Sequence, residues 1–252
     1  MIISRRVILM AVERIEEYGD VLKIILKSTI QFPIGYFYTD NNQIAKQLVE
    51  SYSWYLHKVK NNIYVEAHKG QKKIRFHKEY VYLLLNYYTD YIDHINGLGI
   101  DNREVNLNIV TNSYNRRNIQ SLGYRFATRH CFQPRYNLDG KHFNSDSYKT
   151  EPEVLIATCH LRGEIYSDYN YNFFLDRRND LDILDLELTK KITTQEAIYL
   201  HVKRYVESNP WYAYRYNLFD YCKENNIKIP DFELDTEGFM IDINTKQRLC
   251  PY

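Results

Sequence analysis

The segment from residue 91 to 118 constrains the fold most, because it places a glycine-rich turn between two short apolar runs. Residues 91–94 have a strand pattern, and the Asn-Gly-Leu-Gly stretch at 96–99 requires a turn or loop. Residues 106–110 form a second strand pattern, and Thr111 is suited to cap the N-terminus of a helix after it. The expected local order is therefore strand, loop, strand, helix.

The same segment holds the residue types that hydrolysis of a phosphodiester needs. His94 can take a proton from water near neutral pH, and Asp93 beside it offers the carboxylate oxygen that a hard divalent cation prefers. On a strand these two side chains point to opposite faces, so the turn directly after them matters. Taken singly, Asp93 and His94 equally suit a turn. Asn106 and Asn115 equally suit helix caps, and only the whole set indicates catalysis.

These residues stand in a fixed register that matches a known family. The pattern is Asp93-His94-x-x-Gly97, Asp101-Asn102, Asn106-Leu107, Val110-Thr111 and Asn115-x-x-Asn118. It resembles the HNH endonucleases, and in particular their phage and intron-homing branch, over about residues 52–118. Asn106 lies twelve residues after His94, and Asn115 lies nine residues after Asn106, so the spacings match without a gap. The resemblance implies a ββα-metal nuclease core.

The resemblance also implies a role for each matched residue. His94 would be the general base, and Asn106 would orient it. Asp93 and Asn115 would bind one divalent metal ion, Mg²⁺ or Mn²⁺. Asn108 departs from the family pattern, in which arginine is common, so one phosphate contact would be missing or would come from another basic residue. The predicted activity is metal-dependent cleavage of one or both strands of DNA.

The net charge of +1 argues weakly against a nucleic-acid partner, but it hides two basic flanks. Residues 54–90 carry seven Lys or Arg against three acids, and residues 116–149 carry seven against two. Residues 164–190 hold seven acids against three bases, and we expect them to face away from DNA. Ordinary solvated surface explains the basic flanks equally well. The side chains predicted to contact DNA are Lys72, Lys73, Arg75, Arg103, Arg116, Arg117, Asn118, Arg125 and Arg129.

The alternation of strand and helix patterns predicts the α+β fold class. The expected regions are a β-rich N-terminal lead-in at 1–51, the HNH nuclease domain at 52–120, and a C-terminal DNA-binding region at 121–252. The last region is expected to hold two hairpin-helix units, at about 123–162 and 170–207, with residues 181–188 as a strand of the second. Both units are similar to AP2-like DNA-binding modules.

Other features limit the class of protein. No apolar run approaches the ~20 residues of a membrane helix, so no membrane partner is expected. The four cysteines form no C-x-x-C pair, which argues against a structural zinc site. We expect a protein of the cytoplasm, in a bacterial or phage-infected cell.

Two other functions fit the same residues. One is a DNA-binding protein with an inactive motif, and the other is a structural or interaction protein that retains only the fold. The sequence leaves open the target sequence, the choice between monomer and homodimer, and a homing or other phage role.

Overall fold

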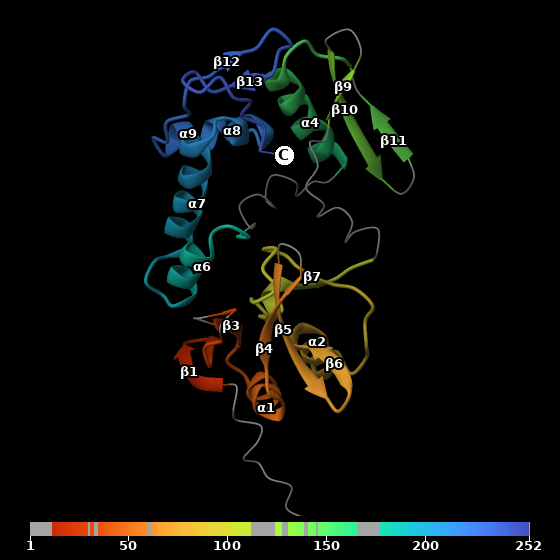
Figure 1. Cartoon of the computed structure of the whole chain (residues 1–252), viewed down its shortest axis with the longest axis vertical. Helices are drawn as coiled ribbons and strands as arrows, with labels where there is room; N and C mark the ends of the chain where they lie inside the picture. Colours follow the sequence, from red (N-terminus) through yellow and green to blue (C-terminus); the bar gives the residue numbers. More distant parts are fainter. Residues whose placement is uncertain are drawn as a thin grey trace, which may run out of the picture. The chain divides into compact units, whose positions relative to one another are not determined.

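The computed structural model describes most of the chain and divides it into two compact units. The described residues are 12–29, 31–32, 35–59, 62–111, 124–127, 131–138, 141–144, 146–165 and 177–251. The first unit comprises residues 1–115 together with 176–192, and the second comprises 116–175 together with 193–252. Both contain helices and strands, so the α+β class is confirmed (Figure 1).

The first unit contains three small antiparallel sheets and three α-helices among its described residues. The sheets have the orders β1-β2-β3, β4-β5-β6 and β7-β8. The strands are β1 (Val12–Tyr18), β2 (Val21–Leu26), β3 (Gly35–Asp40), β4 (Tyr55–Val59), β5 (Asn62–Lys69), β6 (Lys72–Arg75), β7 (Ile92–His94) and β8 (Leu107–Ile109). The helices are α1 (Gln43–Ser51), α2 (Phe76–Leu85) and α6 (Leu181–Leu188).

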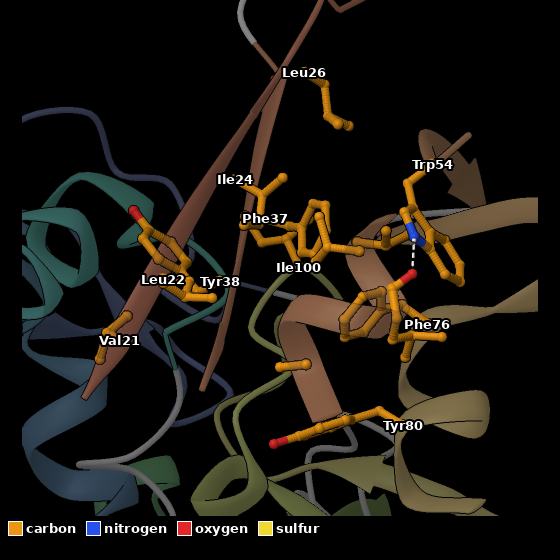
Figure 2. Packing of buried hydrophobic residues seen from close by; sticks show 14 of the residues in the cluster. Val21, Leu22, Ile24, Leu26, Phe37, Tyr38, Trp54, Phe76, Tyr80 and Ile100 are labelled. Carbon is orange, nitrogen blue, oxygen red and sulfur yellow. Dashed lines mark hydrogen bonds between the residues drawn. The ribbon is translucent and has the colours of Figure 1, made fainter. Parts of the chain in front are cut away.

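One hydrophobic core serves the whole first unit. The Phe76 ring packs 4.9 Å from Trp54 and 5.0 Å from Phe37, measured between ring centroids. Trp54 Nε1 donates a 3.0 Å hydrogen bond to the carbonyl oxygen of Leu48, as Figure 2 shows. Residues on both sides of the predicted boundary at 51/52 therefore share a core, and the N-terminal lead-in is no separate body.

The sheet β4-β5-β6 has one apolar and one polar face, because successive side chains on a strand alternate. Val65 and Ile74 lie in the core, and Leu56 packs against it. Glu66 is paired in register with Arg75, and these two belong to the opposite face. That polar face is the one on which most of the predicted basic residues of this region stand.

Helix α6 completes the first unit from far along the chain. Leu184 and Leu188 are buried in its core, and Asp185 forms an ion pair of 2.5 Å with Lys23. Tyr38 donates a hydrogen bond to the same carboxylate. The prediction of a strand at 181–188 is therefore wrong. Leu181, Leu184 and Leu188 lie on one helical face, which packs on the core. Asp185 in this part of the acidic stretch is paired with a lysine of the same unit.

The second unit is built around a sheet with the order β9-β10-β11 that packs against helix α4. Its strands are β9 (Tyr124–Ala127), β10 (Cys131–Leu138), β11 (Lys141–Asn144), β12 (Glu233–Leu234) and β13 (Met240–Ile241). Its helices are α4 (Glu151–Ile165), α7 (Thr194–Ser208), α8 (Trp211–Arg215) and α9 (Phe219–Glu224). The expected hairpin followed by a helix is present here, whereas the second expected unit is divided between the two bodies.

Hydrogen bonds to the buried carboxylate of Glu151 link several elements of the second unit. Trp211 Nε1 donates to it over 3.3 Å and the Met240 backbone N–H over 2.8 Å, and the Tyr124 hydroxyl donates as well. Burial raises the pKa of Glu151, while these donors oppose that shift. Among the residues that the structure describes, no helix has both the length and the apolar character required to span a membrane.

Candidate active site

The strand-loop-strand expected around the motif is present. In the antiparallel pair β7-β8, Asp93 stands opposite Asn108 and His94 opposite Leu107. Cross-strand partners share a face, so adjacent Asp93 and His94 belong to opposite faces of this short pair. His94 is the last residue of β7, and the chain turns directly after it.

Buried amides hold that turn in place. Asn106 Oδ1 accepts a hydrogen bond of 2.9 Å from the Asn96 backbone N–H, and Asn106 Nδ2 donates to Asn96 Oδ1 over 3.0 Å. Asn106 Nδ2 also donates to the Asp101 carbonyl oxygen over 2.8 Å. The Ile95 N–H donates to the Asn106 carbonyl oxygen over 2.9 Å. Asn106 therefore fixes the loop next to His94 at both of its ends.

Asp101 is the buried charge of the loop, and Arg103 neutralises it. Arg103 Nε lies 2.8 Å from Asp101 Oδ1, and Nη2 lies 2.8 Å from Oδ2, a bidentate pair. Asn96 Nδ2 donates to the same carboxylate over 2.7 Å. The guanidinium of Arg103, predicted to contact DNA, is thus engaged inside the protein.

The His94 side chain is buried, with a 5% exposed fraction. Its ring meets His77 edge to face, with 4.9 Å between the centroids, and lies 6.1 Å from the Tyr64 ring. Burial lowers the pKa of His94 to about 4, and the Arg75 charge adds to that shift, while Asn102 and Asp101 oppose it. The imidazole is therefore neutral at pH 7, the form that can accept a proton.

Asn102 is the residue whose side chain reaches the His94 ring. Its Oδ1 lies 3.4 Å from His94 Nε2. The Asn102 side chain is fully buried, and its backbone N–H donates to the carbonyl oxygen of Tyr38 over 2.9 Å. The motif includes Asn102, but its spacing alone gave no sign of this contact, because the contact depends on the path of the loop.

The predicted metal ligands are only partly described. Asp93 is half-buried on β7 and takes part in interactions of its own. Asn115, the predicted second ligand, lies outside the described residues, as do Arg116, Arg117, Asn118 and Arg129. Within the described ranges, no three His, Cys, Asp or Glu side chains gather into a group that could hold a metal. The Asp93 carboxylate next to His94 nevertheless has the donor chemistry that Mg²⁺ and Mn²⁺ favour.

The basic residues on the polar face of β4-β5-β6 surround one carboxylate. Glu66 is 1% exposed, with His57 Nδ1 at 2.9 Å, Lys73 Nζ at 3.1 Å and Arg75 Nε at 3.2 Å. The Arg75 guanidinium also lies 4.7 Å from the centroid of the Tyr64 ring, which packs near His94. Through Tyr64, the charged face that carries Lys73 and Arg75 is thus linked to the neighbourhood of His94. Exposed Lys72 lies next to Lys73 on β6.

A segment far along the chain also reaches the loop after His94. The Arg177 backbone N–H donates to the Asn96 carbonyl oxygen over 2.9 Å. Gly97 has a φ of +74°, and a Cβ atom there would lie 2.6 Å from Arg178 Cγ. The Arg178 side chain thus packs over this turn, and it is exposed to solvent. Because Arg178 lies 81 residues after Gly97 in the chain, no local pattern indicates this contact.

In the second unit, Arg125 lies on a sheet face that also carries Gln133. The two residues are paired in register, and Arg125 Nη2 donates to Gln133 Oε1 over 2.6 Å. Arg125 and Arg135 are both exposed.

Comparison with known proteins gives the chain no relative: no family model, curated protein or solved structure matches it.

Proposed function

We propose that this protein is an HNH-type endonuclease that hydrolyses phosphodiester bonds of DNA. The observation that carries the proposal is a neutral, nearly buried histidine at the end of β7, which follows Asp93 directly in the chain and precedes a hydrogen-bonded loop. A general base must be unprotonated at working pH and fixed relative to its water, and both conditions favour His94.

In the proposed reaction, His94 takes a proton from a water molecule whose oxygen attacks phosphorus. The bond from phosphorus to the leaving sugar oxygen breaks, and that oxygen is protonated by solvent. Asn106 keeps the turn after His94 in one conformation through its bonds to Asn96 and Asp101. A fixed base avoids the entropy loss of ordering a flexible side chain at each turnover.

Asp93, together with Asn115, would hold the divalent cation. When bound, Mg²⁺ or Mn²⁺ supplies positive charge that offsets the charge developing on the phosphate. Asp93 contributes a carboxylate from the strand that ends at the base. This arrangement requires the Asp93 and His94 side chains, which lie on opposite faces of β7, to reach the same phosphate group.

DNA would be held by basic residues around this site. Lys73 and Arg75 on the polar sheet face, the exposed Lys72 next to Lys73 on β6, and Arg178 over Gly97 offer phosphate contacts in the first unit. Arg125 offers one in the second unit. Arg103 has a different role in this proposal, because its charge stabilises the buried Asp101.

A plasmid-nicking assay with Mg²⁺ tests the proposed function. Wild-type protein is expected to convert supercoiled to open-circular or linear DNA, and His94→Ala to be slower by 10²–10⁴-fold, the usual contribution of a general base. Asp93→Ala is expected to lose metal-dependent cleavage. His160→Ala, an exposed histidine of α4, is the matched control and should cleave normally.

Each rival function has its own outcome in the same experiment. Undiminished cleavage by His94→Ala would remove His94 as the base. DNA binding in a gel shift without cleavage by any variant would favour a binding protein with an inactive motif. The absence of both binding and cleavage would favour a structural or interaction protein.

A further inference from the structure

Asn102 combines two features that a scaffold residue seldom has together. Its side chain is 0% exposed, and its amide oxygen faces a ring nitrogen of the proposed base, His94 Nε2, at 3.4 Å. Within the part of the chain that the structure describes, its Nδ2 has no hydrogen-bond partner. A buried amide N–H₂ without a partner destabilises the folded state, so packing alone would favour an apolar residue of similar shape here.

We propose that Asn102 is the positioning residue that selects the tautomer of His94. An amide oxygen can only accept, so the contact requires the proton of the neutral ring to be on Nε2. The lone pair is then on Nδ1, and this nitrogen becomes the base. The inference rests on the proposed function for its catalytic meaning, although the tautomer itself is a property of the folded protein.

The backbone around Asn102 holds its oxygen rigidly. Tyr38, on β3, donates its N–H to the Ile100 carbonyl oxygen over 2.8 Å and accepts from the Asn102 N–H over 2.9 Å. The loop is thus held on both sides of Asp101 by β3, an edge strand of its sheet. The edge-to-face contact with His77 restrains the plane of the His94 ring.

This assignment gives two asparagines of the motif different tasks. The resemblance to HNH nucleases assigns orientation of the base to Asn106, whose hydrogen bonds go to Asn96 and to the backbone of Asp101. Asn106 therefore shapes the loop, and Asn102, carried by that loop, contacts the ring.

Long-range ¹H–¹⁵N NMR of the full chain at neutral pH tests the proposal. The His94 resonances are expected to show the Nε2–H tautomer in the wild type. Asn102→Leu, which keeps the volume and removes the acceptor, is expected to populate the Nδ1–H form. Asn102→Asp, which keeps an acceptor oxygen, is expected to retain Nε2–H. Asn108→Leu, on β8 opposite Asp93, is the control and should leave the tautomer unchanged.

Cleavage kinetics supply the second readout. We expect Asn102→Leu to lower kcat by 10–100-fold with little change in KM, and Asn102→Asp to recover most of the loss. An Nδ1–H tautomer in the wild type, or an unchanged tautomer in Asn102→Leu, would overturn the proposal. If Asn102→Leu fails to fold, the wild-type and Asn102→Asp spectra still decide it. The expected tautomers in a protein that cleaves no DNA would refute only the proposed function.

Discussion

His77 and His94 pack edge to face, and solvent reaches neither ring freely. Burial lowers the pKa of His77 well below its ordinary value of 6.5, and the neighbouring His94 lowers it further, with smaller effects from Arg75 and Lys78. The folded protein therefore holds a neutral His77. The stability that the neutral, buried His77 contributes is fully present above pH 6.5. It decreases as the pH falls, because the unfolded chain takes up a proton that the folded chain does not.

We predict that His77→Phe reduces the loss of stability on acidification. One histidine contributes at most about 1.4 kcal/mol per pH unit below 6.5. The measurement is the free energy of unfolding in urea at pH 7 and pH 5, compared between wild type and variant. His68→Phe is the control, because His68 is exposed and solvent reaches its ring in the folded state. An equal pH dependence in wild type and His77→Phe would contradict the prediction.

Glu66 offsets part of the positive charge on the polar sheet face. Its neighbours lower its pKa through hydrogen bonds, above all Lys73, although burial opposes that shift. We predict that Glu66→Gln strengthens DNA binding, since Lys73 and Arg75 then face the phosphates without a competing carboxylate. The slope of log K against log salt concentration should become steeper by about one.

Fluorescence anisotropy with a labelled duplex, titrated across salt concentrations, measures that slope. Glu50→Gln, on the exposed side of α1, makes the same change in net charge away from this surface and is the matched control. If the salt dependence of DNA binding has the same slope for Glu66→Gln and Glu50→Gln, the polar sheet face has no special role in binding.

Residue identities in the candidate site were predictable, but the contacts between them were not. The register of the motif indicated Asp93, His94 and Asn106 without any structure. It did not show that Asn102 meets the His94 ring or that Arg103 neutralises Asp101, because both contacts depend on how the loop returns over itself. The two pairs are eight and two residues apart within a loop, where no regular helix or strand period predicts which side chains meet.

At the scale of elements, the local residue pattern predicts a helix or strand correctly where that pattern agrees with the packing of the element in the fold. The residue patterns at 21–26, 35–38 and 62–67 predict strands, and the Thr193-x-x-Glu196 spacing predicts a capping box. The strands β2, β3 and β5 and the N-terminus of α7 confirm these predictions. The helical pattern at 43–49 predicts Asp40 as its N-cap, but the N-cap of α1 is Asn42, and Asp40 accepts from the Tyr80 hydroxyl instead. For α1 the pattern is sufficient to predict the helix, whereas the exact cap depends on a residue 40 positions away.

We predict that Arg178, at the start of the segment leading into α6, contributes to DNA binding. Its exposed side chain covers Gly97 in the turn after His94, so Arg178→Gln should weaken binding several-fold and make the salt slope shallower by about one. The same anisotropy titration measures both. Arg14→Gln, an exposed arginine of β1 in the same unit, is the matched control. Equal effects of the two substitutions would exclude a specific contact at Arg178.

At the scale of the whole chain, the division into units was the least predictable feature. Sequence alone suggested a nuclease domain at 52–120, because the motif ends there. The first unit in fact begins with the N-terminal strands and includes 176–192. No shift in composition marks this arrangement. The sequence of α6, about 60 residues beyond the motif, has no local feature that distinguishes it from a helix of the second unit.

The composition of the first unit predicts how fragments will behave. A fragment of residues 1–120 lacks α6, and with it the burial of Leu184 and Leu188, each worth about 1.5–3 kcal/mol, and the Asp185–Lys23 pair. Because a domain is stable by only about 5–15 kcal/mol, we expect this fragment to unfold at a clearly lower temperature or to aggregate. Joining residues 176–192 to it through a Gly/Ser linker should restore cooperative unfolding, followed by circular dichroism. The same linked fragment with Leu184→Ala and Leu188→Ala is the control and should remain unstable. If the 1–120 fragment melts at the same temperature as the linked one, α6 is not an integral part of the unit that holds the candidate active site.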